Sequence, residues 1–311
     1  MSVPSFISYL LLEKNYSKHT VDAYGNDIGS FADFCNKKYE LDNIGAVEYT
    51  LIRSWIVELV NEGISNRSVN RKIASLKAYY KFLQRIGAID NNPLAKHKAL
   101  KTSKKIEVPF SEEEMQRILG QITFEDDFEG HRDKLIIELL YTTGIRRSEL
   151  INLKTKDVDL SGKSIKVLGK RNKERIVPLL ASTIELFTSY FIRRNNLVEI
   201  FDNEYVFLVK SGNKIYETLV YRIIKGYFSK VSSKVKRSPH ILRHTFATHL
   251  LNKGADLNSV KELLGHASLA STQVYTHNSI TELKKVHSSA HPRGKKCDVD
   301  SNSLTFKIFN L

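Results

Sequence analysis

The chain has 311 residues, which is longer than one ordinary domain and suits two. Hydrophobic residues at 41% and charged residues at 26% are typical of globular proteins and exclude wholesale disorder. The 48 Lys and Arg against 34 Asp and Glu give a formal net charge of +14, which favours a polyanionic partner. Cys35 and Cys297 are far apart and lack metal-ligand spacing, which argues against a disulfide scaffold and against a cysteine-built zinc site. We therefore expect a reducing, cytoplasmic setting, and no membrane partner, because the apolar stretch 9–12 is too short to span a bilayer.

The first third of the sequence predicts a bundle of helices. Apolar residues recur every three or four positions after Ser17, and again between Thr50 and Gly63, which predicts two helices. A third helix is expected over residues 66–86, followed by Gly87. Residues 66–105 contain eleven basic side chains and a single acid, so this part of the chain has a high density of positive charge.

One face of the predicted 66–86 helix is basic. At about 100° per residue, four cations fall opposite the apolar stripe: Arg67, Arg71, Lys81 and Arg85. Ala74 and Ala78 lie between them, and small residues in a row of cations let a helix approach a phosphate backbone closely. A solvated helix face is the plain alternative. The absence of acids on this face favours nucleic-acid binding by the four cations.

The remaining two thirds predict a mainly helical second domain with one small β insertion. Residues 91–110 contain two prolines and many lysines without a periodic apolar face, which indicates a basic linker. Ser111 and Glu114 form a capping-box pattern that begins the second domain. Strands are expected over 164–168 and 174–179, joined by 169–173. Helices are expected over 132–141, from Arg146 or Arg147, and around 181–195, 215–231, 240–252, 256–264 and 279–288.

Five clusters of polar residues carry the chemistry. They are Gly144–Leu150, Gly169-Lys170 with Asn172–Arg175, His240–His244, Leu264–His266, and Tyr275. In this order they resemble the signature of the tyrosine recombinases, the phage-integrase family. The segments Tyr275–His277 and Ala290–Gly294 are similar to the C-terminal part of the Xer branch of that family. The resemblance spans residues 5–293.

The resemblance implies a mainly α, two-domain, C-shaped DNA clamp. Residues 1–90 would form a helical core-binding domain (a SAM-like bundle), and 91–110 a basic linker. Residues 111–293 would form a mostly α catalytic domain with a small β-hairpin or sheet insertion. The chain then departs from the family pattern, because residues 294–311 form a tail to which the sequence gives no role.

The resemblance also implies site-specific DNA recombination without metal, ATP or another cofactor. Tyr275 would be the nucleophile that forms a 3′-phosphotyrosyl intermediate, and Arg146 and Arg243 would bind the phosphate under attack. The other implied catalytic residues are His240 as proton acceptor, Lys170 as proton donor to the leaving oxygen, and His266 as a hydrogen-bond donor. Glu149 is expected to orient cations. Lys173 lies in the same turn as Lys170 and is a rival for its role.

Several functional alternatives stay open from the sequence. The implied partners are a double-stranded DNA recombination site, a homo- or hetero-tetramer on two duplexes, and a septal DNA translocase as activator in chromosome dimer resolution. The alternatives are the integrase of a mobile element, a catalytically silent DNA-binding protein, and a type IB topoisomerase. His240 and His244 have the spacing of zinc ligands, but no Glu follows His240 as a metalloprotease needs. We also expect residues 279–289 to dock on a neighbouring subunit.

Overall fold

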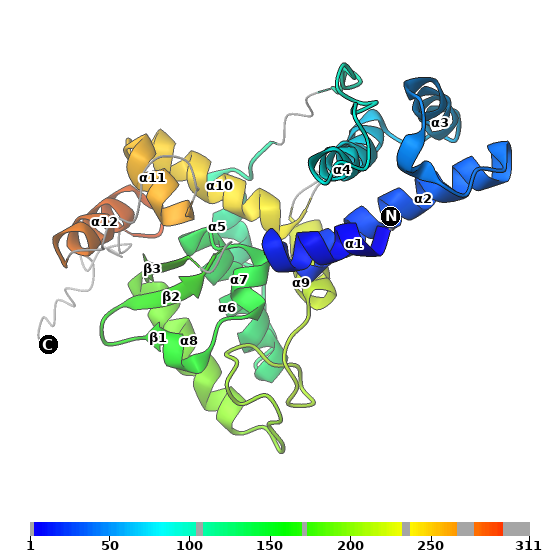
Figure 1. Ribbon diagram of the computed structural model, residues 1–311. Coiled ribbons are helices and arrows are strands. Elements are labelled where there is room, and N and C mark those ends of the chain that lie inside the picture. Colours follow the sequence, from blue (N-terminus) through cyan, green and yellow to red (C-terminus); the bar gives the residue numbers. More distant parts are fainter. Residues whose placement is uncertain (1–2, 104–107, 170–172, 232–236, 266–276, 295–311) are drawn as a thin grey trace, which may run out of the picture. The chain divides into compact units, whose positions relative to one another are not determined.

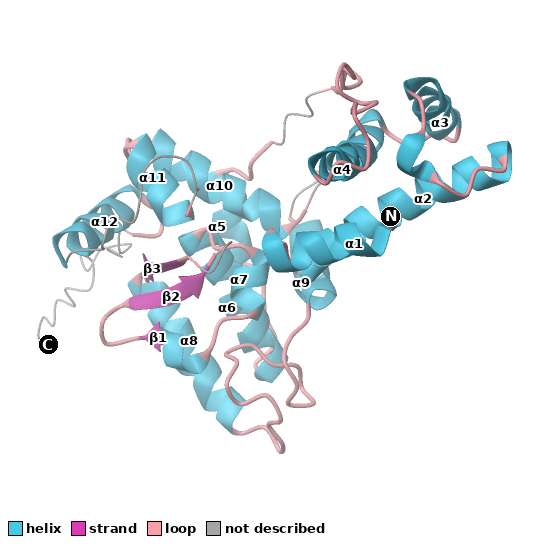
Figure 2. Ribbon diagram, in the orientation of Figure 1, coloured by secondary structure: helices cyan, strands magenta, loops and turns pink. Residues whose placement is uncertain are grey.

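The computed structural model describes residues 3–103, 108–169, 173–231, 237–265 and 277–294. These residues are mainly helical, with one small antiparallel sheet, as the sequence predicts (Figures 1 and 2). The chain divides into two compact units, residues 1–105 and 106–311, each with its own hydrophobic core. Within the described ranges, no helix is both long enough and apolar enough to cross a bilayer.

The N-terminal unit is a bundle built around three long helices. Its elements are α1 (Val3–Ser8), a π-helical segment (Tyr9–Glu13), α2 (Lys18–Tyr39), a short 3-10 turn (Ile44–Ala46), α3 (Tyr49–Asn61) and α4 (Asn66–Arg85). The apolar stripes of α2, α3 and α4 meet in one core that contains Phe31, Trp55 and Leu76, all at most 2% exposed. The three helices expected from periodicity are therefore present, whereas α1 was not foreseen because only Phe6 and Leu10 of this region are fully buried.

The first part of the expected linker is attached to the N-terminal unit. Leu94 is fully buried in its core. The Asn70 side chain on α4 accepts from the backbone N–H of Leu100 and donates to its carbonyl, both at 2.9 Å. Asn66 likewise donates to the carbonyl of Lys101 at 2.8 Å. These side-chain amides satisfy backbone groups of residues 100 and 101, which therefore stay attached to α4. This part of the expected linker is fixed to the N-terminal unit.

The C-terminal unit surrounds a small sheet with helices. Its helices are α5 (Glu112–Gly120), α6 (Phe128–Thr143), α7 (Arg147–Ile151), α8 (Ala181–Asn195), α9 (Glu217–Ser229), α10 (Pro239–Asn252), α11 (Leu257–Leu264) and α12 (His277–Ala290). The strands β1 (Val158–Asp159), β2 (Ser164–Leu168) and β3 (Glu174–Pro178) pair antiparallel in the order β1-β2-β3, with Ile165 opposite Val177. The predicted capping box is present: Ser111 accepts from the backbone of Glu114, and Glu114 accepts from the backbone of Ser111. Strand β1 escaped prediction because two residues carry no periodicity.

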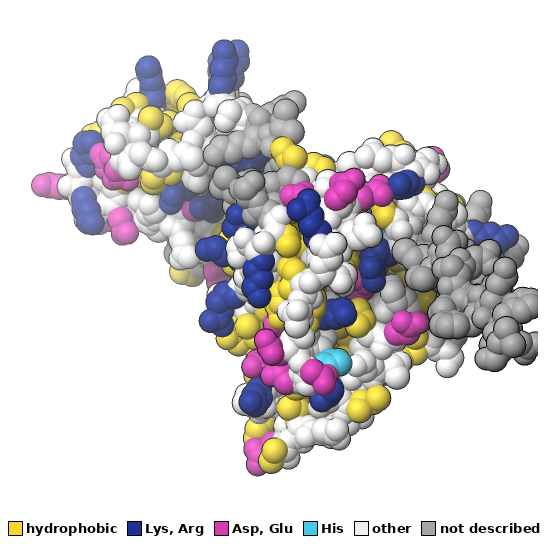
Figure 3. All heavy atoms as spheres, turned by 180° about the vertical axis from the view of Figure 1, so that it is seen from behind, with side chains coloured by type: hydrophobic (Ala, Val, Ile, Leu, Met, Phe, Trp, Pro, Cys, Tyr) yellow, Lys and Arg dark blue, Asp and Glu magenta, His cyan; other side chains and the backbone are white. Residues whose placement is uncertain are grey.

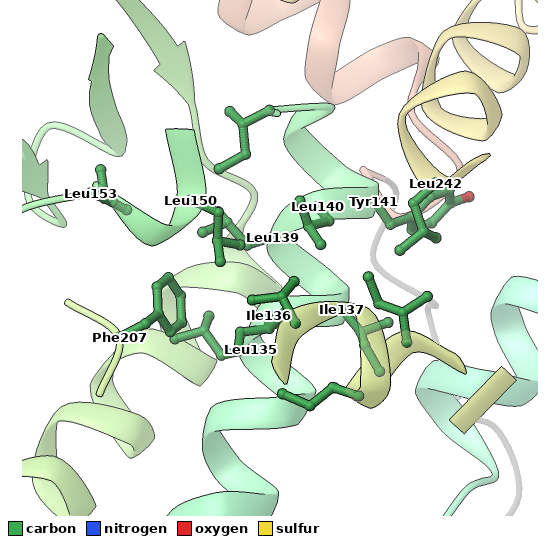
Figure 4. Close-up of a cluster of buried hydrophobic side chains, with 14 of the residues drawn as sticks. Leu135, Ile136, Ile137, Leu139, Leu140, Tyr141, Leu150, Leu153, Phe207 and Leu242 are labelled. Atoms are coloured by element: carbon green, nitrogen blue, oxygen red, sulfur yellow. The ribbon is translucent and has the colours of Figure 1, made fainter. Parts of the chain in front are cut away.

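Helix α6 is the central element of this unit. Leu135, Ile136, Ile137, Leu139 and Leu140 are all fully buried, and every residue of α6 from Leu135 onward is buried, so the C-terminal part of the helix has no solvent face. Figure 4 shows its side chains packed between residues of α7, α10 and the segment after α8. The C-terminal end of α6 therefore leads into the following turn from a rigid support.

Helix α12 packs on its own domain in the single protomer of the structure. Leu283 is 5% exposed and lies in a cluster with residues of α10 and α11. His287 is 1% exposed, and its Nε2 donates to the carbonyl of Thr142 at the end of α6 at 2.6 Å. The docking of residues 279–289 on a neighbouring subunit stays a prediction, because the structure contains one protomer.

The burial of His287 predicts an acid-sensitive attachment of α12. Burial lowers the pKa of His287 from its usual 6.5 to about 4. Since the unfolded chain takes up this proton first, stability is full above pH 6.5 and declines as the pH falls toward 4, by at most about 3 kcal/mol. Thermal unfolding between pH 7.5 and 5 measures this, and His287→Gln should reduce the pH dependence without abolishing it, because burial also lowers the pKa of His291. His19→Gln, at an exposed position of α2, should leave it unchanged; equal behaviour of the two variants would contradict the assignment.

Candidate active site

A tight turn between α6 and α7 positions Arg146. Gly144 ends α6 with φ +61°, in the left-handed region that glycine adopts most readily. A Cβ at this position would lie 2.3 Å from a ring carbon of Phe246 on α10, so a larger residue would displace that helix. Two residues later, Arg146 caps the start of α7. The chain therefore needs glycine here to bring Arg146 and α10 together.

The carboxylate of Glu149 holds two arginines. It is 2% exposed and accepts hydrogen bonds from the backbone N–H and Nη1 of Arg146, both at 2.7 Å. Arg175 on β3 donates to it through Nη1 and Nη2, both at 2.9 Å. Burial alone would raise the pKa of Glu149, but the hydrogen bonds and charge of Arg175, with help from Arg146, outweigh burial and lower it. Glu149 is thus an ionised anchor for two cations.

Arg243 reaches the same place from α10. Its Nη1 donates to the carbonyl of Gly144 at 2.5 Å, and its Nη2 to the carbonyl of Leu264 at 2.6 Å. Burial lowers the pKa of Arg243 to about 10, and the charge of Arg146 acts in the same direction. The guanidinium nevertheless stays protonated at neutral pH. Two like charges are thus held near each other in a partly buried position, which is unfavourable without an anion.

Three arginines meet at the C-terminal end of α11. Arg175 Nε donates to the carbonyl of Leu263 at 2.9 Å, Arg243 to that of Leu264, and Arg146 Nη2 to that of Gly265 at 3.2 Å. These are the last carbonyls of the helix, where the helix dipole is negative and hydrogen-bond acceptors are free. The convergence fixes where the chain leaves α11, immediately before His266.

The predicted catalytic residues are only partly within the described structure. Arg146 and Arg243 lie together, and the exposed His240 stands one helical turn before Arg243 on α10. Lys170, His266 and Tyr275 lie outside the described residues. The rival Lys173 is exposed, and its carbonyl accepts a hydrogen bond from Gly169 N–H at 2.8 Å across the base of the hairpin loop.

Arg175 is the residue of this site to which sequence reasoning gave no role. It is 5% exposed in β3, where it shares the buried face with Val177. A charged residue in phase with the inward positions of a strand was the available signal, because a buried arginine must find partners. Its partners, Glu149 and the carbonyl of Leu263, come from separate elements that only the fold brings together.

Comparison with known proteins identifies the group to which this arrangement belongs. The sequence model of the phage integrase family matches residues 109–282, and that of the N-terminal SAM-like domain of phage integrases matches residues 3–87. The chain belongs to the phage integrase family. Its activity is therefore that of a tyrosine recombinase, site-specific cleavage and rejoining of DNA.

Relatives with assigned names cover nearly the whole chain. A tyrosine recombinase XerC of Chlorobaculum parvum is 38% identical over 92% of this chain and 93% of its own length. A XerC of Oceanobacillus iheyensis is 40% identical over 94% of this chain and 96% of its own. Among solved structures, the XerH recombinase bound to a palindromic difH substrate has a TM-score of 0.69 at 24% identity, covering 88% of this chain and 81% of that one. The Tn1549 transposon integrase with transposon right-end DNA has a TM-score of 0.66 at 21% identity, covering 92% and 99%. Both solved structures share their fold with this chain.

The expected DNA-binding cations of α4 are exposed but not equivalent. Arg67 and Lys81 are exposed, and the described part of the chain gives them no ion-pair partner. Arg85 donates to the Tyr9 hydroxyl at 3.2 Å, and Arg71 is paired with Asp27 of α2. On the face of the molecule in Figure 3, Lys and Arg side chains stand among Asp and Glu rather than in one basic sheet. The net charge alone therefore does not define a binding face, and the acid-free stripe of α4 remains the informative feature.

Removing the central anion of the site should destabilise the recombinase strongly. Glu149→Ala leaves the buried Arg175 without its carboxylate partner, and breaking a buried pair in this way costs about 3–5 kcal/mol. Thermal or urea unfolding measures the loss. The control is Glu217→Ala, which removes the more exposed partner of Arg147 and should cost less than about 1 kcal/mol. Similar losses in both variants would mean that Glu149 is not an anchor.

Proposed function

We propose that Arg146 and Arg243 bind the scissile phosphate of a DNA site and that Tyr275 attacks it. The observation that supports this is the pair of guanidiniums, both held on the last carbonyls of α11 directly before His266. A phosphodiester under attack gains charge on its non-bridging oxygens, and forked, permanently charged donors suit those oxygens better than a lysine does. Their positions are already fixed by Glu149 and backbone carbonyls, so little reorganisation is needed when the phosphate binds.

The proposed reaction exchanges one phosphate ester for another. The Tyr275 oxygen forms a bond to phosphorus while the bond from phosphorus to the 5′ oxygen breaks, leaving a 3′-phosphotyrosyl link and a 5′-hydroxyl. A free tyrosine with a pKa of about 10 is only about one part in a thousand ionised at neutral pH. We therefore assign the tyrosine proton to His240 and the proton for the leaving oxygen to Lys170, with His266 donating a hydrogen bond to the phosphate.

Rejoining runs the same step in reverse with a different strand. The 5′-hydroxyl of the partner duplex attacks the phosphotyrosyl link and releases Tyr275. Because the ester bond is conserved in the intermediate, no nucleotide cofactor is required. We propose that four protomers on two duplexes carry out the exchange, with the 1–90 domain and its α4 cations Arg67, Arg71, Lys81 and Arg85 against the DNA.

We propose a Xer-type role in chromosome dimer resolution. This assignment is supported by the relatives named XerC, which match more than nine-tenths of the chain at 38–40% identity. The substrate would then be a short, partly palindromic chromosomal site, with a septal DNA translocase as activator and the cytoplasm as the place of action. In this role, two of the four protomers could be supplied by a paralogue, which would make the assembly a hetero-tetramer.

The covalent intermediate gives the direct test of the chemistry. The full chain should form a protein–DNA adduct with a nicked suicide duplex that carries a site selected from randomised DNA. Tyr275→Phe should form none. Arg243→Ala should slow adduct formation by about 10²–10³-fold, the usual effect of one transition-state donor, while binding the duplex normally. Arg193→Ala, at a half-buried position paired with the exposed Asp126, is the matched control and should cleave normally. An adduct in Tyr275→Phe, or full cleavage by Arg243→Ala, would refute the assignment.

Sequencing the chromosomal DNA that is trapped on Tyr275 in cells separates the two biological roles. A single chromosomal site near the replication terminus supports the Xer role. Attachment repeats beside an excisionase-like gene would show instead that the protein is the integrase of a mobile element.

A further inference from the structure

We propose that Asp27 holds Arg71 in position to read a guanine in the major groove, rather than to neutralise a phosphate. The proposal rests on the proposed placement of α4 against DNA and deepens it, because it names a residue that determines which sequence is bound. It also separates Arg71 from the other cations of the α4 stripe, with which the sequence grouped it.

Asp27 is a buried acid at the edge of this exposed basic stripe. It belongs to α2, its side chain is 2% exposed, and its Oδ2 accepts a hydrogen bond from Ser75 Oγ at 2.8 Å. Arg71 Nη1 donates to Oδ2 at 2.5 Å and Nη2 to Oδ1 at 2.9 Å. The side chain of Arg71 remains 53% exposed. One edge of the guanidinium is thus fixed to the protein interior while much of the side chain faces solvent.

The geometry of the pair leaves a recognition edge free. Arginine has five N–H donors, and Asp27 engages one on each terminal nitrogen. The edge formed by Nε and the adjacent terminal nitrogen is the fork that suits O6 and N7 of guanine. Because Arg71 has already lost its rotamer freedom on folding, it loses little more on binding.

Charge argues against a phosphate contact at this position. Asp27 compensates the charge of Arg71 through two hydrogen bonds, whereas Lys72, whose Nζ lies 3.6 Å from the same carboxylate, leaves one net positive charge on the three residues. A compensated cation releases few counterions and adds little to sequence-independent binding. Arg67 and Lys81, by contrast, have no ion-pair partner among the described residues. Arg71 is also followed along the stripe by Ala74 and Ala78, which allow close approach to base edges, whereas Arg67 and Lys81 stand on either side of this central part, as phosphate contacts do.

The test compares the DNA preferences of four variants in the full-length protein. Each is used to select duplexes from a randomised library, and the salt dependence of binding to the duplex preferred by the wild type is then measured. Arg71→Lys keeps the charge and the pairing with Asp27 but lacks the fork, so it should lose a five- to hundredfold preference for guanine at one position. Asp27→Asn, which is isosteric, should lose the same preference. The slope of its log binding constant against log salt concentration should become steeper by up to about 0.9, because the charge of Arg71 is then no longer compensated by Asp27.

Arg67→Ala is the matched control and should keep every base preference while the salt slope falls by about 0.9. The proposal is overturned if Asp27→Asn and Arg71→Lys keep all base preferences of the wild type. It is also overturned if Arg71→Ala, the fourth variant, behaves like Arg67→Ala. A wild type that cleaves DNA and selects a sequence shows that the proposed function stands even when the variants contradict the role of Asp27. A wild type without any sequence preference would overturn both.

Discussion

The C-terminal unit depends on one buried carboxylate. Glu149 lies between Arg146 and Arg175 and accepts four hydrogen bonds from them. Without this anion, two guanidiniums would be brought together with Arg243 in a partly buried place, and their mutual repulsion would oppose folding. With it, the three arginines can each donate to one of three consecutive carbonyls at the end of α11. The same set of contacts stabilises the unit and prepares a site of positive potential.

The support of this site extends through the core. The C-terminal part of helix α6 is buried on all sides and leads into Gly144, whose carbonyl accepts a hydrogen bond from Arg243 and whose missing side chain lets Phe246 approach. Packing therefore sets the distance between α6 and α10, and the distance between these helices sets the distance between Arg146 and Arg243. The apolar packing between α6 and α10 thus determines how far apart the guanidiniums of Arg146 and Arg243 lie. A transition-state site requires this kind of rigid support.

The sequence predicted the regular elements well because their periodicity is strong. The stripes of α2, α3 and α4 and the alternation in β2 and β3 are visible without the fold, and the expected partnership of Glu149 with cations is confirmed. What the sequence could not predict are contacts between residues far apart in the chain. Arg175 meets Leu263 across 88 positions, and Arg71 meets Asp27 across 44, so neither partner is marked by local spacing. An apolar helix face likewise does not say which surface will cover it, so the cluster of α12 with α10 and α11 could not be read from local spacing.

We propose that the arginine pair acts on the negative charge of the scissile phosphate. A substrate with a methylphosphonate at that position lacks one of the two non-bridging oxygens and its negative charge, so the benefit of the guanidiniums should largely disappear. We predict that the cleavage defect of Arg243→Ala relative to the wild type shrinks from about 10²–10³-fold on phosphate to less than about tenfold on methylphosphonate. An equal defect on both substrates would contradict the claim, because Arg243 would then serve cleavage in some way other than neutralising this phosphate.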